Sequence, residues 1–403
     1  MEQDSFTSAM PGSWVQNIGG HITFMPNPLP RDTTWMGSLL GLLNDSALEL
    51  GRLQGALQQL DGLHPDLLLR PLIRREATLS SRIEGTLAAE EDLALFEVSD
   101  RVEDEVPDVR ELRNYARALE WGATEVANTG ITPAFVKRLH QMLMTNIRGG
   151  DDTPGQFRVK QVLIGGDGTY SRAKFVPAPA VHVGALIDDL TAFMADAKAI
   201  PPLVRAAMAH YQFETIHPFK DGNGRVGRLL IAIQVVRDFQ MQLPALHMSA
   251  YFEADRRSYY DGLLNLSKTG RWADWTEYFL LGVVRQAKDT VDRLGSLRDL
   301  RRAYRQKFER ARGSVLTAKA IDLLFQQPAV TIRTLADHLG VTNTAAQQHI
   351  KRLEDAGILK EATGKTYGRV FIAREIIDLA RKSSKLRELP PIFEASNSSQ
   401  RRL

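Results

Sequence analysis

Apolar residues recur at every third or fourth position over most of the chain up to about Lys288. Runs such as LLGLLNDSALELGRLQGALQQL and TPAFVKRLHQMLMTNI keep this spacing over several turns, which predicts amphipathic helices. The run GRVGRLLIAIQVVRDF is apolar on nearly all sides, which predicts a central buried helix. We therefore expect a mainly α fold for this part of the chain.

Two segments depart from the helical spacing. The first 31 residues contain four prolines and three glycines and keep no sustained period, so we expect an irregular lead-in there. Further on, VKQVLIGG and AKFVPAP are rich in β-forming residues and flank the turn-prone GGDGTYS. This arrangement predicts a β-hairpin over 159–177.

A separate module is predicted near the C-terminus, over 314–379. TIRTLADHLGVTNTAAQQHIKRLEDAGILK contains a helix, a turn at Gly340 and a second helix, and two β-rich runs follow, as in a winged helix-turn-helix. A basic helical connector, 291–313, precedes the module. Between 293 and 312 it holds seven Arg and one Lys against two acidic residues. A polar tail, 380–403, follows the module.

Length and composition indicate a globular protein of two or three domains, with 403 residues of which 43% are hydrophobic and 25% charged. The absence of cysteine excludes disulfides and thiolate metal sites and fits a reducing compartment, so we expect a cytoplasmic protein. No Lys or Arg precedes Arg31, and no apolar run approaches the ~18 residues of a membrane span. We therefore expect no signal peptide, no transmembrane segment and no membrane partner.

The stretch HPFKDGNGRVGR combines an imidazole, a carboxylate, a Gly-Asn-Gly turn and two arginines. Its glycines fit the dinucleotide fingerprint GxGxxG, but a helical segment precedes them where that site needs a strand, and the βαβ unit is absent. A simple helix–helix turn would explain the glycines alone. A helix that begins at about Asn223 would present N–H groups and the positive end of its dipole, which together form a phosphate cradle.

The charged side chains of this stretch suit a nucleoside triphosphate. Arg225 and Arg228 are three residues apart on one helix face, where two guanidinium groups can hold successive phosphates. Asp221 is an oxygen ligand suited to a Mg²⁺ that keeps most of its waters and bridges phosphate oxygens. His217 is suited to remove a proton from an incoming hydroxyl. The residues therefore predict phosphoryl or nucleotidyl transfer.

This stretch resembles the HxFx(D/E)GNGRxxR signature of the Fic (Fic/DOC) family, whose members transfer AMP from ATP to a hydroxyl of a target protein. Every specified position matches, and TPGQFR, VLIGG, FVPAP, SYYDGL and WTEYFL extend the similarity from about Pro28 to about Leu281. The resemblance implies a Fic-type helical bundle with its catalytic core at 101–290. An N-terminal helical region, 1–100, would precede this core.

The resemblance also implies a role for single residues. His217 would be the general base and Asp221 the Mg²⁺ ligand, with attack at the α-phosphorus of ATP and departure of pyrophosphate. The implied ATP-binding residues are Gly222, Asn223, Gly224, Arg225, Gly227 and Arg228, of which the two arginines hold the distal phosphates.

The adenine pocket is less firmly implied. Tyr259 or Tyr260 would line it, although tyrosines at helical spacing belong more often to the core. In the segment DRRSYY, Asp255 stands where the family often has Asn, so the contacts to the base and the ribose are open.

Fic proteins use a hairpin similar to 159–177 as a flap that aligns the target protein. A lone hairpin in a helical domain has an exposed edge, and an extended target segment can add to such an edge by β-augmentation. A Tyr, Thr or Ser hydroxyl of the target would thereby reach His217. A purely structural hairpin is the alternative.

EATLSSRIEGT matches the (S/T)xxxE(G/N) inhibitory motif of one class of Fic proteins at Ser80, Glu84 and Gly85, on a predicted helix 71–86. In that class the glutamate pairs with the second arginine of the signature, here Arg228, and blocks the productive position of the γ-phosphate. Without the resemblance, Glu84 could equally be a surface glutamate at a helix C-terminus with no inhibitory role.

The winged helix is compatible with DNA or with a protein partner, the target, or a second copy of the chain in a homodimer. For DNA, phosphate contacts would come from Lys351, Arg352, Lys360, Lys365 and Arg369, and base contacts from Asn343, Gln347 and Gln348.

Two alternatives to an adenylyltransferase stay open. One is a DNA-binding regulator that senses nucleotide without catalysis. Because such a sensor needs a phosphate cradle but no base, His217 favours the enzyme. The other is a hydrolase that removes AMP from modified proteins, in which Glu84 positions a water.

Overall fold

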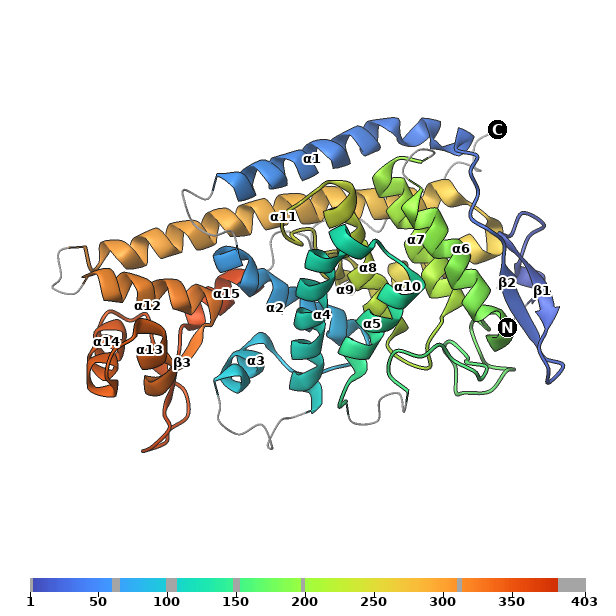
Figure 1. Ribbon diagram of the computed structural model, residues 1–403. Helices are drawn as coiled ribbons and strands as arrows, with labels where there is room; N and C mark the ends of the chain where they lie inside the picture. Colours follow the sequence, from blue (N-terminus) through green and yellow to red (C-terminus); the bar gives the residue numbers. More distant parts are fainter. Residues whose placement is uncertain are drawn as a thin grey trace, which may run out of the picture. The chain divides into compact units, whose positions relative to one another are not determined.

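The computed structural model describes residues 3–59, 66–98, 107–147, 153–196, 200–309 and 314–382, and most of these are helical, as expected (Figure 1). The chain divides into two compact units. The first comprises residues 1–50, 117–286 and 385–403, and the second comprises 51–116 and 287–384. Helices α1 (Leu40–Gln58), α4 (Pro107–Thr129) and α11 (Trp272–Gln306) each contain one of the points of division.

The first unit is a helical bundle with a small two-stranded sheet. Besides its parts of α1, α4 and α11, it contains η1 (Gln3–Ser5), β1 (Gly12–Gln16), β2 (Ile22–Pro26), η2 (Thr34–Leu39), α5 (Pro133–Met144), η4 (Ala180–His182), α6 (Val183–Ala195), α7 (Pro202–Ile216), α8 (Asn223–Asp238), α9 (Ser249–Ala254) and α10 (Arg256–Thr269).

Helices α7 and α8 form the centre of the first unit. They pack against each other, with α6 against α7 and α5 against α8. Nearly every residue of α8 is buried, which confirms the helix predicted from its all-round apolar pattern. The approach of α4 is close, since a Cβ on Gly122 would lie 2.3 Å from Cδ1 of Ile233. This packing surrounds α8 with α4, α5 and α7.

The prediction of an irregular lead-in over the first 31 residues is wrong in part. Residues of β1 and β2 pair antiparallel, with Trp14 opposite Phe24. The rings of Phe6, Trp14 and Phe24 pack at centroid distances of 4.6 to 6.0 Å. The alternating aromatic and β-branched residues around NIGG therefore form a hairpin that the high Pro and Gly content obscured.

The predicted hairpin over 159–177 forms only a single β-bridge, between Ile164 and Phe175. Regular pairing stops there because Gly165 and Gly166 both have positive φ, and a Cβ on Gly166 would lie 2.3 Å from the carbonyl oxygen of Arg172. We call residues 159–177 the flap loop. The N-terminal hairpin covers the C-terminal segment of the flap loop, because the N–H of Phe24 donates to the carbonyl oxygen of Val176 across 2.9 Å.

The second unit contains the winged helix together with two helices from the N-terminal part of the chain. Its elements besides parts of α1, α4 and α11 are α2 (Asp66–Ile83), α3 (Glu90–Glu97), α12 (Ser314–Gln326), β3 (Ala329–Thr331), α13 (Ile332–Leu339), α14 (Asn343–Asp355), β4 (Lys360–Glu361), β5 (Val370–Ile372) and α15 (Arg374–Arg381). The three strands pair in the order β3-β5-β4.

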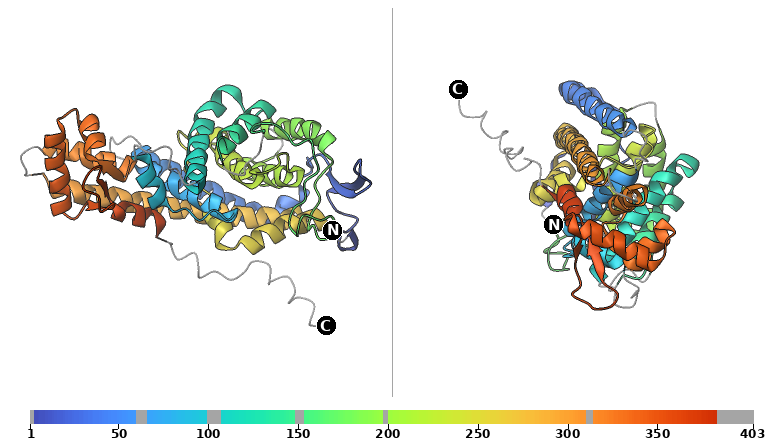
Figure 2. Two further views of the ribbon diagram at one scale, coloured as in Figure 1. Left: turned by 90° about the horizontal axis from the view of Figure 1, so that it is seen from below. Right: turned by 90° about the vertical axis from the view of Figure 1, so that its left-hand side faces the viewer.

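The predicted winged helix is confirmed (Figures 1 and 2). Thr331 and Thr342 cap α13 and α14 with their side chains, and Gly340 ends α13 in the left-handed conformation.

Much of the predicted connector 291–313 is the last part of the 35-residue α11. Most of the predicted polar tail lies outside the described residues. No described helix has both the length and the apolar character needed to span a bilayer.

Candidate active site

His217 lies at the C-terminal end of α7 in a left-handed conformation, with φ 50° and ψ 63°. A non-glycine residue rarely adopts this conformation, and here it turns the chain from α7 into the α8 turn. Nδ1 of His217 is 3.3 Å from the carbonyl oxygen of Glu214. An Nδ1–H donated to this oxygen leaves Nε2 as the basic nitrogen. The negative end of the α7 dipole stabilises the imidazolium that would form.

The turn between the two helices is held by hydrogen bonds within itself. Asn223 accepts from the N–H of Phe219 across 2.8 Å and donates from Nδ2 to the carbonyl oxygen of Phe219 across 2.9 Å. Gly222 precedes α8 with φ 75°, and a Cβ there would lie 2.8 Å from Sδ of Met144. Asn223 thus fixes the turn, and Gly222 gives it the backbone conformation of an anion cradle.

The two arginines of the signature emerge from the first turns of α8. Arg225 is 4% exposed and Arg228 is 1% exposed. Gly227 lies between them, and a Cβ on it would lie 2.3 Å from Oε1 of Glu214, so this residue must be small. Gly224 is half-buried in the same turn. Buried guanidinium groups at a helix N-terminus form an electrostatically positive site suited to phosphate.

Asp221 contrasts with the arginines because its side chain is 56% exposed. Its Oδ1 accepts from the N–H of Gly222 across 2.6 Å and lies 3.6 Å from Nη2 of Arg225. No cluster of three metal-ligating side chains occurs among the described residues. A single exposed carboxylate beside a phosphate cradle fits Mg²⁺, which is usually held by one or two carboxylates together with substrate phosphates and waters.

His140 of α5 holds the α7–α8 turn in position by hydrogen bonds. The sequence analysis did not predict this role. Its Nδ1 accepts from the N–H of Gly155 across 2.8 Å, which makes Nε2 the protonated nitrogen. Nε2 then donates to the carbonyl oxygen of Asp221 across 3.1 Å, and the ring stacks on Phe219 at 3.7 Å. His140 is therefore a positioning residue for Asp221.

Arg158 is a second supporting residue that the sequence did not reveal. This buried side chain donates to the carbonyl oxygens of His217 at 2.8 Å and Ile216 at 3.3 Å, so it caps α7. It also donates to Lys160 at 3.2 Å and Ala178 at 2.6 Å, at the two ends of the flap loop. Burial lowers the pKa of Arg158 to about 10.

The two tyrosines proposed for the adenine pocket differ in their surroundings. Tyr259 is 1% exposed, its hydroxyl lies 2.8 Å from Nε2 of His210, and its ring stacks on Phe252. Tyr260 is 46% exposed. Asp255 caps α10 and accepts from the N–H and the hydroxyl of the serine three residues on.

The residues of the inhibitory motif belong to the second unit. Helix α2 ends at Ile83, so Glu84 follows its last residue, and Gly85 has φ 101°. Ser80 is buried in the last turn of α2, and Glu84 is exposed. These positions agree with the predicted end of the helix, and the pairing of Glu84 with Arg228 stays a prediction.

Three family models match parts of the chain, and one of the matches includes the turn between α7 and α8. The model of the Fic/DOC family matches residues 130–235, that of the Fic/DOC family N-terminal domain matches 40–124, and that of an HTH domain matches 317–368. The chain therefore matches the Fic/DOC family over these two ranges and carries an HTH domain near its C-terminus.

Relatives with curated names cover only part of the chain. A probable protein adenylyltransferase of Aquifex aeolicus is 27% identical over 199 residues, which are 46% of this chain and 59% of the relative. The protein adenylyltransferase fic-1 of Caenorhabditis elegans is 35% identical over 85 residues, 21% of this chain and 15% of the relative. This chain thus spans less than two thirds of either protein.

The solved structure of a Fic family protein from Desulfovibrio desulfuricans is similar in fold. The similarity covers 86% of this chain and 98% of that chain, with a TM-score of 0.55 and 20% sequence identity. At this identity the match supports the fold alone.

Proposed function

We propose that the protein is an adenylyltransferase that transfers AMP from ATP to a Tyr, Thr or Ser hydroxyl of a target protein. The proposal rests on one observation: His217 ends α7, Asp221 lies in the adjoining turn, and two buried arginines begin α8. A base, a metal-binding carboxylate and a phosphate cradle are the groups that such a transfer needs. The names of the two relatives support the same activity.

In the proposed step the target hydroxyl oxygen attacks the α-phosphorus of ATP. A bond forms between this oxygen and the phosphorus, the bond from the phosphorus to the β-phosphate oxygen breaks, and pyrophosphate leaves. Nε2 of His217 takes the proton of the hydroxyl. Arg225 and Arg228 bind the distal phosphates and stabilise the charge that develops on the leaving group.

Asp221 is the residue that would hold Mg²⁺ together with the phosphates of ATP. The ion would neutralise charge on the phosphate oxygens. His140 keeps the backbone of Asp221 in position through its Nε2–H.

The flap loop supports a specific mode of target docking. Val176 already pairs with Phe24, so one side of the loop is covered by the N-terminal hairpin. On the other side, the N–H of Leu163 has no backbone acceptor within the described residues. We therefore place the extended target segment beside 161–163, where its backbone would pair by β-augmentation.

Glu84 would act as a brake on this reaction. The end of α2 disfavours a carboxylate because the helix dipole is negative there, so Glu84 gains by pairing with a cation elsewhere. Pairing with Arg228 would occupy the guanidinium that the γ-phosphate needs. The inactive and active states would then differ by the position of Glu84.

The decisive test is transfer of label from ATP labelled at the α-phosphate, with Mg²⁺ and cell extract as a source of targets. Wild type is compared with Glu84→Gly, Glu84→Gln and the double variant Glu84→Gly with His217→Ala. We expect covalent labelling to rise on the order of ten- to a hundredfold in both Glu84 variants and to vanish in the double variant.

Other outcomes separate the alternatives. Labelling in none of the variants would rule out the transferase and favour the nucleotide-sensing regulator. Release of AMP from premodified protein that needs Glu84 would favour the hydrolase. If labelling did not change on loss of Glu84, the proposed inhibition by Glu84 would be wrong, whereas the transferase activity would still stand.

A further inference from the structure

The segment that carries the inhibitory motif shares its hydrophobic core with the winged helix. Helix α2 packs against α12 and α15, and α3 packs against β3 and α15. Ala94 and Val98 lie in one buried cluster with residues of the wing sheet and α15, namely Ala329, Val370, Ile372 and Ile377. The motif therefore lies between two helices that the winged helix holds.

Ion pairs fix the same segment. Arg374 of α15 donates from Nε and Nη2 to Oε1 of Glu91, across 3.1 and 2.9 Å. Arg75 of α2 lies 3.5 Å from Asp289, which accepts two hydrogen bonds from Arg293 across 2.7 and 2.9 Å. Arg293 also donates to the last carbonyls of α15. Moving α2 and α3 away from the winged helix would break the buried pair of Arg75 with Asp289 and the more exposed pair of Arg374 with Glu91.

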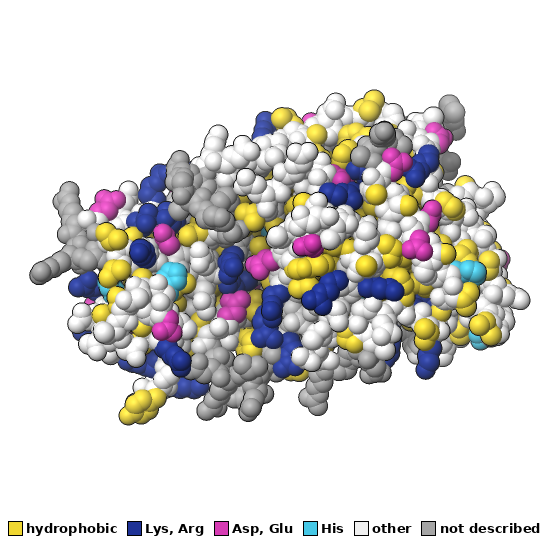
Figure 3. Space-filling view, viewed as in Figure 1, with side chains coloured by type: hydrophobic (Ala, Val, Ile, Leu, Met, Phe, Trp, Pro, Cys, Tyr) yellow, Lys and Arg dark blue, Asp and Glu magenta, His cyan; other side chains and the backbone are white. Residues whose placement is uncertain are grey.

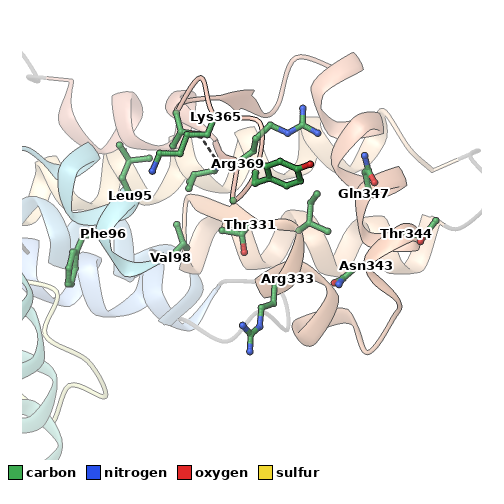
Figure 4. A pocket seen from close by; sticks show the side chains of 15 residues that line it. Leu95, Phe96, Val98, Thr331, Arg333, Asn343, Thr344, Gln347, Lys365 and Arg369 are labelled. Atoms are coloured by element: carbon green, nitrogen blue, oxygen red, sulfur yellow. Dashed lines mark hydrogen bonds between the residues drawn. The ribbon is translucent and has the colours of Figure 1, made fainter. Parts of the chain in front are cut away.

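A groove of about 870 Å³ opens between α3, the helix-turn-helix and the wing, which is the loop 362–369 (Figure 4). Leu95 of α3 and Val98, which follows α3, line one end, and Asn343 and Gln347 of α14 line the other. The groove thus has a wall that belongs to the segment next to Glu84.

The charged residues that line the groove are all positive. They are Arg333 on α13 and Lys365 and Arg369 on the wing, and none of its described lining residues is acidic. Lys and Arg side chains are also visible on the surrounding surface in Figure 3. Cations from separate elements around one concave surface suit the phosphates of a polyanion.

The remaining lining residues favour duplex DNA over an acidic protein. Asn343 and Gln347 lie four residues apart on the second helix of the helix-turn-helix, and both are exposed. Side-chain amides on this helix match the donor and acceptor pattern of base edges in the major groove. The wing carries Tyr367, which is 89% exposed and lies where a wing meets the DNA backbone.

We propose that this groove binds duplex DNA and that the bound duplex contacts α3, thereby holding the segment that carries Glu84 against the winged helix. Because binding free energies are reciprocal, a ligand that stabilises the docked form of α3 must oppose its release. The effect on catalysis rests on the proposed function: bound DNA would keep the brake engaged and lower self-labelling.

The first test measures binding of the full chain to a fluorescent 30-base-pair duplex of mixed sequence by anisotropy over a range of salt concentrations. Arg333→Ala and Arg369→Ala are each expected to weaken binding on the order of fivefold at 0.15 M salt and to lower the salt slope by about one. Arg257→Ala is the matched control, because Arg257 is an exposed cation on α10 and does not line the groove. Equal loss in the control, or preference for polyglutamate over the duplex, would overturn the proposal.

The second test is hydrogen exchange of the backbone amides of 86–98 with and without the duplex. At a duplex concentration near the Kd of the wild type, we expect slower exchange in wild type and in Arg257→Ala, and less slowing in Arg333→Ala. Unchanged exchange in wild type at saturating duplex would refute the contact with α3. If exchange slows but self-labelling stays constant, the groove assignment stands and the proposed role of Glu84 fails.

Discussion

Arg158 donates from Nε to the carbonyl oxygen of His217 across 2.8 Å, and from Nη2 to the carbonyl oxygen of Ala178 across 2.6 Å. One buried guanidinium thus connects the end of α7, which carries the candidate base, with the end of the flap loop. Its pKa of about 10 remains well above neutral, so the group stays charged at physiological pH. The candidate base and the proposed docking site for the target share one support.

Replacement of Arg158 should therefore affect both stability and transfer. Arg158→Ala leaves buried carbonyl oxygens without their donor, and we expect the free energy of unfolding to fall by about 2–3 kcal/mol. Arg158→Lys should retain part of the stability but lose most of the transfer rate, because an ammonium cannot reach all the acceptors. Denaturant melts and label transfer measured well below the melting temperature separate the two effects.

Arg172→Ala is the control for this prediction. Arg172 lies in the flap loop itself, but its side chain is 75% exposed and pairs only with Asp167 in the described structure. Exposed ion pairs contribute little, so its loss should change neither quantity measurably. If Arg172→Ala lowered the transfer rate as much as Arg158→Lys, the hydrogen bonds of Arg158 would not be the cause of the loss.

Gly227→Ala tests the packing behind the two arginines. The added Cβ would lie 2.3 Å from Oε1 of Glu214, so the carboxylate or α8 must move. We expect KM for ATP to rise on the order of tenfold, since Arg228 follows directly on the same turn, with a loss of about 1–3 kcal/mol of stability. Gly184→Ala on α6 has open space around its Cβ and should leave ATP binding unchanged.

Local signals made the helical elements readable from the sequence. The all-round apolar pattern of α8 predicted its burial, and the turn at Gly340 between two helical runs predicted the helix-turn-helix. The signature residues from His217 to Arg228 could be recognised because they follow one another in one short stretch of the sequence. Each of these predictions depends on residues within a few positions of each other.

The supports of the site were not readable, because they depend on contacts between distant segments. Arg158 reaches carbonyl oxygens 58 and 59 residues away, and His140 reaches one 81 residues away. The flap loop looked like a full hairpin because its strand propensity is high, but Gly165 and Gly166 limit it to one bridge. Its actual partner, Phe24, lies in a segment that composition made look irregular.

His210 gives the protein a specific pH dependence of stability. Burial, together with the nearby Arg228, lowers the pKa of His210 from its usual range to about 3. Between pH 6.5 and 3 the unfolded chain binds a proton there that the folded chain does not, so stability is full above pH 6.5 and falls as the pH falls. At pH 5 the loss amounts to about 2 kcal/mol relative to pH 7.

Melts of wild type and His210→Gln between pH 4 and 8 check this dependence. The variant should be less stable at pH 7 but lose less stability towards pH 5. His182→Gln, a change at an exposed histidine, should keep the slope of the wild type. Parallel profiles for wild type and His210→Gln would show that other groups cause the acid sensitivity.

Tyr259 and Tyr260 are neighbours in sequence but should respond oppositely to substitution. Tyr259→Phe removes the hydroxyl that lies 2.8 Å from Nε2 of buried His210, so we expect a loss of about 1–2 kcal/mol of stability and an unchanged KM for ATP. Tyr260→Ala removes a ring that is 46% exposed, so stability should change little. If this ring stacks on the adenine, KM for ATP should rise on the order of tenfold, whereas the inhibition constant of inorganic triphosphate, which competes for the phosphate site alone, should stay unchanged. If KM for ATP rose in Tyr259→Phe instead, the adenine would bind against Tyr259, and the assignment of Tyr259 to the aromatic core would be wrong.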